Sequence, residues 1–380
     1  MQARTFELPT KVVLGAGALG EVPTLVGDRV FVVTDPGIVA AGHCERLERL
    51  LADAGIEVHR YQDVQPNPDE HAVAACLAAF ERAGDGIEWI VALGGGSAID
   101  VAKGCAMLAC GGGRMADYLG RARIDVTSPR LIAIPTTAGT GSETQSFALI
   151  GNRDTGQKMA CGGSAPFATV LDPELTVSMP APVTACTGLD TLAHAVEAAV
   201  SRRSTPWSAT FAREAFRLVE RHFERVLGQP DDLDARAAML HASALAGIAI
   251  ENGMLGAAHS MANPLTRRFD TAHGQAVGQA LPAVVAYNAG DPSARIGYAD
   301  LARGSALVTN DADDGVAVDA LLRRLRTLVE RAGFGPHIPG VPSAAADELA
   351  AEAATQWTAQ FNPRDVDVAA FAGLYREVLA

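Results

Sequence analysis

Four side chains with metal-binding chemistry stand out in the second half of the 380-residue chain. Asp190 and His194 are four residues apart in a stretch with helical pattern, so both project from one face, one turn apart. His259 follows in a segment of small residues, and His273 stands directly before Gly274 at the start of another helical stretch. A carboxylate with three imidazoles suits a divalent transition metal and leaves one coordination position open for a substrate oxygen.

Each of these residues also has an ordinary structural interpretation. An Asp/His pair at this spacing often forms an ion pair on a helix face, as Asp190 and His194 would. A histidine beside glycine or small residues often packs or caps a helix. Spacing alone therefore leaves both interpretations open.

Two polar, glycine-containing segments follow apolar runs in the first half of the chain. Gly94-Gly95-Gly96-Ser97 comes after Trp89–Leu93 and leads into an uninterrupted helical pattern, so its amides and the helix dipole suit a phosphate. A tight turn between a strand and a helix fits this segment equally well. The segment 135–143, which contains Thr136, Thr137 and Thr140, also follows a predicted strand. Open α/β sheets bind ligands at that edge, although a polar surface turn is the simpler interpretation.

A third segment matches the dinucleotide fingerprint letter by letter. Gly15-x-Gly17-x-x-Gly20 follows an extended run, but Pro23 interrupts the helix that should begin there. Little helix remains to present amides to a pyrophosphate. We therefore expect a plain turn after a strand.

Two periodicities divide the chain into an α/β first half and a helical second half. Short β-branched runs such as Val30–Thr34 alternate with amphipathic helical stretches, which predicts a parallel sheet covered on both faces. The segment 142–172 is expected to form short extended pieces, with hairpins at the sheet edge. After Pro182 only helical patterns follow, so we predict domains at residues 1–182 and 183–380. The predicted helices of the second domain are Thr187–Ser201, Pro206–Leu227, Leu233–Ile250, His273–Asn288, Val316–Ala332 and Ala344–Ala359. The fold class is α/β, with an N-terminal parallel-sheet nucleotide-binding domain and a C-terminal all-helical metal-binding domain.

The composition excludes several functional classes. The formal charge of -13 and the lack of a Lys/Arg cluster argue against a nucleic-acid partner. The sequence shows no secretory signal and no apolar stretch long enough for a bilayer, so we expect no membrane association. Six scattered cysteines without a C-x-x-C pair are typical of reduced thiols in a cytoplasmic protein.

In this order, the motifs resemble the iron-containing (group III) alcohol dehydrogenase family, which shares its fold with dehydroquinate synthase. The matching landmarks span almost the whole chain: Val33-Thr34-Asp35, Pro66-Asn67-Pro68, Gly94 to Ser97 with Asp100 and Lys103, Pro135 to Thr140, Gly188-Leu189-Asp190 with His194, His259, His273-Gly274, and Asn362-Pro363-Arg364.

The resemblance implies an alcohol dehydrogenase or aldehyde reductase that transfers a hydride to or from NAD(H). Phe147 and Phe361, next to the threonine segment and the tail motif, favour a small primary alcohol or aldehyde over a polyol as the substrate. The resemblance implies a metal on Asp190, His194, His259 and His273, with iron expected before zinc. It also implies a homo-oligomer. The residues implied along the cofactor are Asp35, Asn67, Gly94, Gly95, Gly96, Ser97, Asp100, Thr136, Thr137, Thr140 and Lys158.

Two positions bear on coenzyme choice and proton transfer. Asp35, at the end of a predicted strand, could accept hydrogen bonds from a ribose and repel a 2′-phosphate, which predicts NAD in preference to NADP. Many family members carry a further histidine four residues after the third ligand, where this chain has Asn263. Asparagine cannot relay a proton near neutral pH, so a water chain or the cofactor ribose is expected to replace that route.

Three alternatives remain open on the sequence alone. The first is a glycerol-dehydrogenase-like zinc polyol dehydrogenase, because zinc binds such sites more tightly than ferrous iron. The second is a dehydroquinate synthase-like lyase, which needs cations for a phosphorylated substrate, and Arg267 and Arg268 are the only close pair near the ligands. The third is a non-catalytic nucleotide-binding or metal-binding protein.

Overall fold

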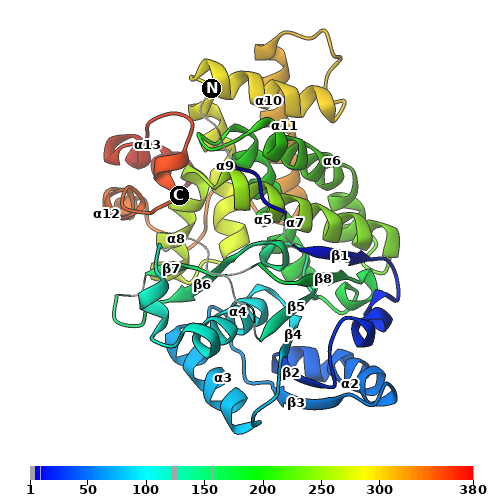
Figure 1. The fold of residues 1–380 in the computed structure, drawn as a ribbon. Helices are drawn as coiled ribbons and strands as arrows, with labels where there is room; N and C mark the ends of the chain where they lie inside the picture. Colours follow the sequence, from blue (N-terminus) through cyan, green and yellow to red (C-terminus); the bar gives the residue numbers. More distant parts are fainter. Residues whose placement is uncertain are drawn as a thin grey trace. The chain divides into compact units, whose positions relative to one another are not determined.

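The computed structural model describes residues 5–8, 10–120, 127, 129–155, 157–163 and 165–379. The chain forms two compact units, which are coloured from blue to green and from green to red in Figure 1. The N-terminal unit comprises Leu8–Met179. The C-terminal unit begins at Pro180 and also includes the segment that ends at Glu7.

The N-terminal unit is built on a six-stranded parallel sheet, as the sequence predicts. Its strand order is β1-β8-β5-β4-β2-β3. The strands are β1 (Lys11–Leu14), β2 (Arg29–Val33), β3 (Glu57–Tyr61), β4 (Trp89–Gly94), β5 (Arg130–Pro135) and β8 (Ala168–Leu171).

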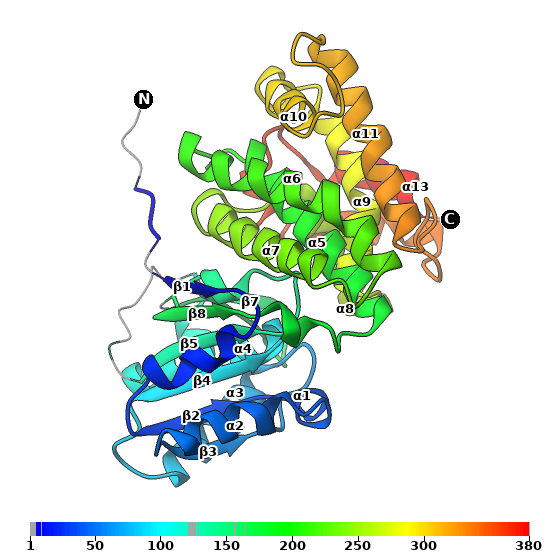
Figure 2. The same ribbon diagram turned by 90° about the vertical axis from the view of Figure 1, so that its right-hand side faces the viewer.

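Helices cover both faces of this sheet (Figure 2). Because side chains alternate along a strand, Val30 and Val32 of β2 enter one core, and Phe31 and Val33 enter the other. The first core is closed by α2 (His43–Asp53) and the 3-10 helix η1 (Ala18–Thr24). The second core is closed by α3 (Glu70–Arg82) and α4 (Gly96–Gly111), and the short helix α1 (Pro36–Ala40) follows β2. The continuous apolar character of β2 and β4 thus reflects burial on both faces.

The segment 142–172 is expected to form hairpins at the edge of the main sheet, and the structure agrees only in part. Strands β6 (Phe147–Gly151) and β7 (Lys158–Gly162) form an antiparallel hairpin that is a separate two-stranded sheet. The last piece, β8, pairs with β1 and β5 inside the main sheet. β8 can occupy this position because all four of its residues are buried.

The C-terminal unit is mostly helical, as predicted. Its helices are α5 (Ala181–Val200), α6 (Pro206–Gly228), α7 (Leu233–Gly253), α8 (Ala257–Phe269), α9 (His273–Asn288), α10 (Pro292–Gly304), α11 (Asp314–Arg331), α12 (Ala346–Ala353) and α13 (Val368–Val378). α5 packs against α6, α7, α9 and α10, so it lies at the centre of the helical core.

Three helices lie in segments where the sequence pattern predicts no separate helix. They are α8, which contains Pro264, α10, which begins with Pro292, and α13. α12 ends at Ala353 although the pattern continues to Ala359, and the Thr355 hydroxyl donates back to the Glu352 carbonyl at this end. α7 is long and apolar enough to cross a membrane, but 72% of its apolar window is buried, which is typical of a core helix.

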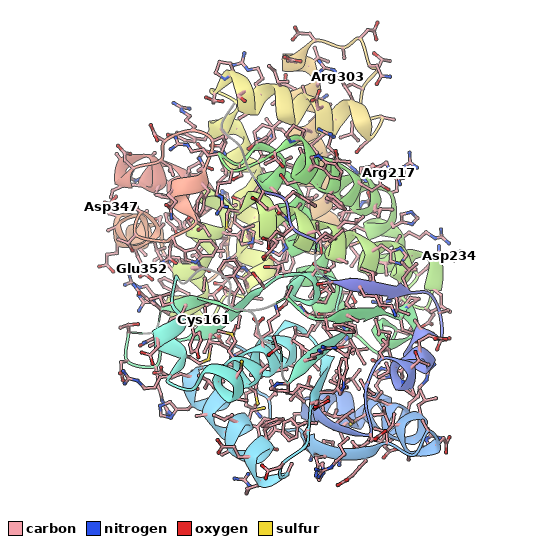
Figure 3. The ribbon with its side chains drawn as sticks, in the orientation of Figure 1. Cys161, Arg217, Asp234, Arg303, Asp347 and Glu352 are labelled. Carbon is pink, nitrogen blue, oxygen red and sulfur yellow. The ribbon has the colours of Figure 1, made fainter. Side chains whose placement is uncertain are left out.

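Ion pairs join the outer helices of the C-terminal unit, several of them near the residues labelled in Figure 3. Arg267 of α8 contacts Glu352 of α12 at 2.6 Å, and Arg376 of α13 contacts Asp347 at 2.5 Å. Exposed pairs of this kind contribute at most about 1 kcal/mol each. The position of α8 therefore depends mainly on buried contacts.

Close helix contacts at α5 require glycine on α9. A Cβ atom at Gly274 would lie 1.9 Å from the Cys186 carbonyl oxygen, and one at Gly278 would lie 2.7 Å from Leu189 Cδ1. No side chain fits between these backbones. The start of α9, with His273 as its first residue, is thereby held directly against α5.

Replacement of Gly274 by alanine should destabilise the fold. We expect Gly274→Ala to lower the free energy of unfolding by roughly 1–3 kcal/mol, because α9 must move away from α5. The control is Gly373→Ala on α13, where a Cβ meets nothing within 4 Å. This exposed helical position should gain about 0.4–1 kcal/mol. Thermal unfolding of both variants tests the pair, and equal melting temperatures would contradict the contact.

Candidate active site

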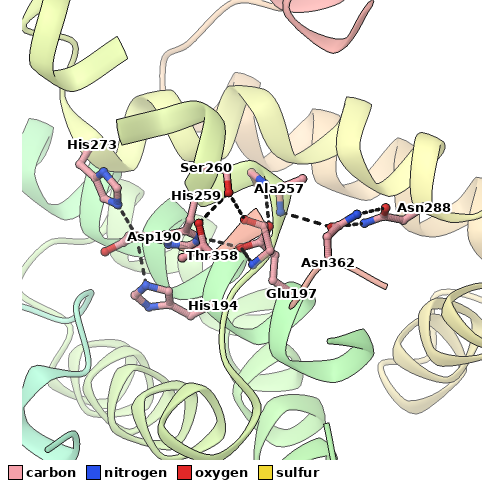
Figure 4. A network of polar contacts seen from close by, with 12 residues as sticks. Asp190, His194, Glu197, Ala257, His259, Ser260, His273, Asn288, Thr358 and Asn362 are labelled. Atoms are coloured by element: carbon pink, nitrogen blue, oxygen red, sulfur yellow. Dashed lines mark hydrogen bonds and ion pairs between the residues drawn. The ribbon is translucent and has the colours of Figure 1, made fainter. Parts of the chain in front are cut away.

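The four predicted metal ligands come together in the C-terminal unit (Figure 4). Asp190 and His194 lie one turn apart on the buried face of α5. His259 is in the first turn of α8, and His273 is the first residue of α9. Residues separated by up to 83 positions in sequence are thus brought to one point by the packing of three helices.

The distances between these side chains match a ligand shell. Asp190 Oδ1 lies 3.4 Å from His194 Nε2, 3.5 Å from His259 Nε2 and 3.8 Å from His273 Nε2. Ligands about 2.1 Å from a tetrahedral metal ion lie about 3.4 Å from one another. The ligand atoms of Asp190, His259 and His273 also all lie within 4.8 Å of one another.

Burial and hydrogen bonding at this point fit a cation. Within the part of the chain that the structure describes, neither Asp190 Oδ1 nor His259 Nε2 has a hydrogen-bond partner, and both atoms are buried. Native proteins rarely leave buried polar atoms in this state, and a metal ion would satisfy both of them. The His273 side chain is 27% exposed, so the cluster is open on that side.

The charges of the cluster shift two pKa values in opposite directions. Burial disfavours the carboxylate of Asp190, but the charge of His194 and the contact with His259 outweigh it and hold the pKa well below its usual value. Burial likewise disfavours charged His259, but Glu197 and Asp190 raise its pKa to about 9. Without a metal, a proton on His259 therefore offsets the negative charges.

Glu197 is a further residue of the site that our sequence analysis missed. Its Oε2 accepts a hydrogen bond from His259 Nδ1 at 2.6 Å, on the side of the ring opposite Nε2. Glu197 lies seven residues after Asp190 and three after His194, so the helical period places it on the same face. That spacing is the signal that would have found it.

Asn263 lies one turn after His259 on α8. Its Nδ2 donates to Gln356 Oε1 at 3.0 Å, and the side chain is half-buried. Gln356 stands in the turn after α12, which the sequence analysis assigned to a helix. This pair of amides can orient a polar group, but neither amide titrates near neutral pH.

The predicted phosphate segment lies at the junction of β4 and α4 in the N-terminal unit. Gly95 precedes the first residue of α4, and among the described residues no side chain caps this helix. Cβ atoms at Gly95 and Gly96 would lie 3.3 Å from Thr137 Cγ2 and 2.7 Å from Thr140 Cγ2. The glycine segment and the threonine segment therefore lie in contact, beside an uncapped helix start that suits a phosphate.

Asp35 lies next to this junction. Its Oδ1 accepts from the amides of Gly37 and Ile38 and so caps α1. A Cβ atom at Gly94 would lie 3.2 Å from Asp35 Oδ2. Oδ1 of this carboxylate thus caps α1, and Oδ2 faces the glycine segment.

A buried polar cluster links α4 to the threonine segment. Lys103 Nζ donates to the carbonyl and hydroxyl of Ser142 at 2.6 and 2.8 Å and to the Phe147 carbonyl at 2.8 Å. The Ser142 hydroxyl donates to Asp100 Oδ1 at 2.6 Å. Burial raises the pKa of Asp100, although Lys103, Ser142 and Lys158 oppose this effect. Asp100 and Lys103 therefore fix the end of the threonine segment.

The remaining predicted positions are more scattered. Thr136 is buried at the end of β5, and Lys158 is half-buried at the start of β7. Asn67 is exposed after β3, with a left-handed φ of 52° that asparagine tolerates. The predicted cofactor positions thus comprise one cluster, formed by the glycine and threonine segments, and a few positions outside it.

The segment Gly15-x-Gly17-x-x-Gly20 begins as a turn, as expected, but Ala18 to Gly20 already belong to the 3-10 helix η1. The turn joins β1 to η1, and the buried carboxylate of Asp172 accepts from the amides of Gly17 and Leu19 at 3.2 and 3.1 Å. A carboxylate from the chain thus occupies the position that a pyrophosphate would need.

Comparison with known proteins agrees with this arrangement. The choline dehydrogenase of Bacillus subtilis (strain 168) is 34% identical over 98% of this chain and 94% of its own length. A solved 1,3-propanediol oxidoreductase superposes with a TM-score of 0.93 at 30% identity and covers 99% of both chains. The sulfoacetaldehyde reductase from Bifidobacterium kashiwanohense, solved in complex with NAD+, gives a TM-score of 0.87 at 28% identity, over 99% of this chain and 98% of its own.

Two family models cover almost the whole sequence. The model for iron-containing alcohol dehydrogenase matches residues 9–173, and the model for the C-terminal part of the Fe-containing alcohol dehydrogenase family matches residues 184–379. They confirm the resemblance carried by the motifs. The chain belongs to the iron-containing alcohol dehydrogenase family.

Proposed function

We propose that this enzyme transfers a hydride between NAD(H) and a small primary alcohol or aldehyde, with a divalent metal on Asp190, His194, His259 and His273. In the oxidative direction an alcohol and NAD+ give an aldehyde, NADH and a proton. The convergence of three imidazoles on the buried Asp190 Oδ1 carries this proposal. We propose that the N-terminal unit, Leu8–Met179, binds the nucleotide and that the C-terminal unit, which begins at Pro180, binds the metal.

A metal ion in this ligand set would act as a Lewis acid that lowers the pKa of the alcohol and so favours departure of the hydride. Asp190 supplies the negative charge of the set, and the imidazoles supply neutral nitrogen ligands. Nitrogen and oxygen ligands of this kind suit ferrous iron and zinc alike, and the family favours iron.

The residues of the N-terminal unit are proposed to bind the coenzyme. The amides at the start of α4 would hold the pyrophosphate on Gly95, Gly96 and Ser97. Thr136, Thr137 and Thr140, with Asn67, Asp100 and Lys158, would follow the rest of the cofactor. Asp35 would bind the adenosine ribose, and its charge would disfavour NADP.

Proton transfer cannot use residue 263 as a base in this chain. Asn263 and Gln356 hold each other and offer only amide groups. We infer that they orient the carboxamide of the nicotinamide or an ordered water. The proton would then leave through water or the cofactor ribose.

The relatives act on different small molecules, so the substrate is proposed only as a class. Their names specify choline, 1,3-propanediol and sulfoacetaldehyde, in each case with a primary alcohol or an aldehyde. Within the C-terminal unit, Phe361 is proposed as an apolar wall of the substrate pocket. The Phe361 ring already packs against Trp357 at 6.2 Å.

The charges near the ligands do not favour a lyase acting on a phosphorylated substrate. Arg267 and Arg268 both pair with carboxylates of α12, Glu352 and Glu348. Their charge is therefore used within the unit. We further propose a cytoplasmic homo-oligomer, as the family resemblance implies.

Removal of the metal should abolish turnover reversibly. We expect chelator-stripped protein to lose NADH formation with short alcohols and to recover it anaerobically with ferrous iron or zinc. Asp190→Asn should lower kcat/KM by about a thousandfold, because Lewis-acid stabilisation is worth several kcal/mol. The control is His222→Ala, a half-buried histidine on α6 outside the cluster. Full activity of metal-free protein, or of Asp190→Asn, would contradict the proposed metal centre.

Coenzyme preference tests the role of Asp35. Asn is as good a helix cap as Asp, so Asp35→Asn should keep α1 intact while removing the charge. We expect the ratio of kcat/KM for NAD over NADP to fall about tenfold, equal to ~1.4 kcal/mol of lost repulsion. Asp367→Asn, the equivalent cap change on α13, should leave the ratio unchanged. An unchanged ratio in Asp35→Asn, or wild-type preference for NADP, would refute this role.

A further inference from the structure

The first turn of α8 is held by side chains that are far away in the sequence (Figure 4). Glu197 accepts from the amides of Gly256 at 3.1 Å and Ala258 at 2.7 Å. The amide between them, on Ala257, donates to Asn362 Oδ1 at 3.2 Å. Amides at a helix start lack partners within the helix, so these two residues together cap α8.

The charge of Glu197 is suited to this position. Its carboxylate is only 4% exposed, and it faces the positive end of the α8 dipole. A buried carboxylate is costly unless it is well hydrogen-bonded, and three donors serve its two oxygens here. Each oxygen of Glu197 therefore has at least one donor at this site.

The third donor to Glu197 is the ring of His259. Because a carboxylate can only accept, Nδ1 of His259 must carry the hydrogen in the 2.6 Å contact. In the neutral ring the lone pair is then on Nε2, the atom 3.5 Å from Asp190 Oδ1. Glu197 thus sets both the orientation of the ring and the nitrogen that is available to a metal.

Asn362 extends this arrangement to the C-terminal tail. Its amide exchanges two hydrogen bonds with Asn288 of α9, at 2.7 and 3.0 Å, and donates to the Arg364 carbonyl at 2.7 Å. α9 is the helix that begins with His273. One buried asparagine therefore links the first turn of α8 to the helix that carries another ligand.

We propose that Glu197 is the positioning residue of the metal centre: it caps α8 and fixes His259 through the same carboxylate, with Asn362 completing the cap. The inference rests on the proposed metal centre. It identifies the residue that fixes the position and orientation of one ligand, His259. Carboxylates behind metal-bound histidines raise metal affinity by orienting the ring and increasing its basicity.

Cobalt binding to the full-length protein tests this role without relying on turnover. We expect Glu197→Gln to raise the Kd for Co2+ by about 10–100-fold and to change the visible absorption of the bound ion. Glu197→Asp keeps the charge on a shorter side chain and should weaken binding less. This variant keeps the test open if Glu197→Gln does not fold.

The matched control is Thr358→Val. Thr358 is buried, and its hydroxyl contacts the hydroxyl of Ser260, the residue after His259, at 2.6 Å. Among the described residues it forms no hydrogen bond with the His259 ring or with an amide of the first turn of α8. We expect this variant to lower the melting temperature and to leave the cobalt Kd within twofold of the wild type. If Glu197 had only a structural role, Glu197→Gln would likewise lower the melting temperature and leave the cobalt Kd unchanged.

The outcomes separate the two proposals. Tight cobalt binding by the wild type, with the same Kd and spectrum in the folded Glu197 variants, would overturn the positioning role and leave the metal centre intact. Failure of the wild type to bind cobalt would contradict the metal centre and, with it, this inference.

Discussion

The C-terminal unit depends on the burial of one carboxylate, Asp190, among three imidazoles. A buried charge without partners would be strongly unfavourable, so the unit must bring His194, His259 and His273 to the same oxygen. Since these residues come from three helices, the requirement fixes how α5, α8 and α9 pack. The close backbone contact at Gly274 helps to meet that requirement for α9, and the side-chain cap from Glu197 and Asn362 does so for α8.

The N-terminal unit is subject to a different constraint, because its ligand is expected to bind to main-chain amides. Such a site needs close approach, and the glycines at the start of α4 provide it by packing directly on two threonines. Lys103 keeps that arrangement rigid, since its ammonium group satisfies three acceptors from the neighbouring segment. The buried charge thus has a structural purpose beside the proposed phosphate site.

Much of this organisation could be predicted because it follows from local periodicity. The buried strands around Val30 and Trp89 have continuous apolar patterns, and the spacing of Asp190 and His194 is a property of a single helix. α8 escaped prediction because Pro264 stands inside it, and a proline within a helical pattern usually marks the end of a helix. The spacing from Asp190 and His194 places Glu197 on the same face of the helix, but its capping role could not be predicted, because two of its three partners are backbone amides 59 and 61 positions away.

The two glycine-rich turns of the chain differ in whether a side chain already binds their amides. Asp172 binds amides of the turn at Gly15 to Gly20, whereas no side chain caps the start of α4 in the described residues. Asp172 is tethered to the first turn, so its carboxylate is present there at a high effective concentration that a dissolved phosphate cannot match. A nucleotide arriving at this turn would meet the like charge of Asp172. The chain thus satisfies two amides of this turn with its own side chain, which leaves the start of α4 as the proposed site for the pyrophosphate.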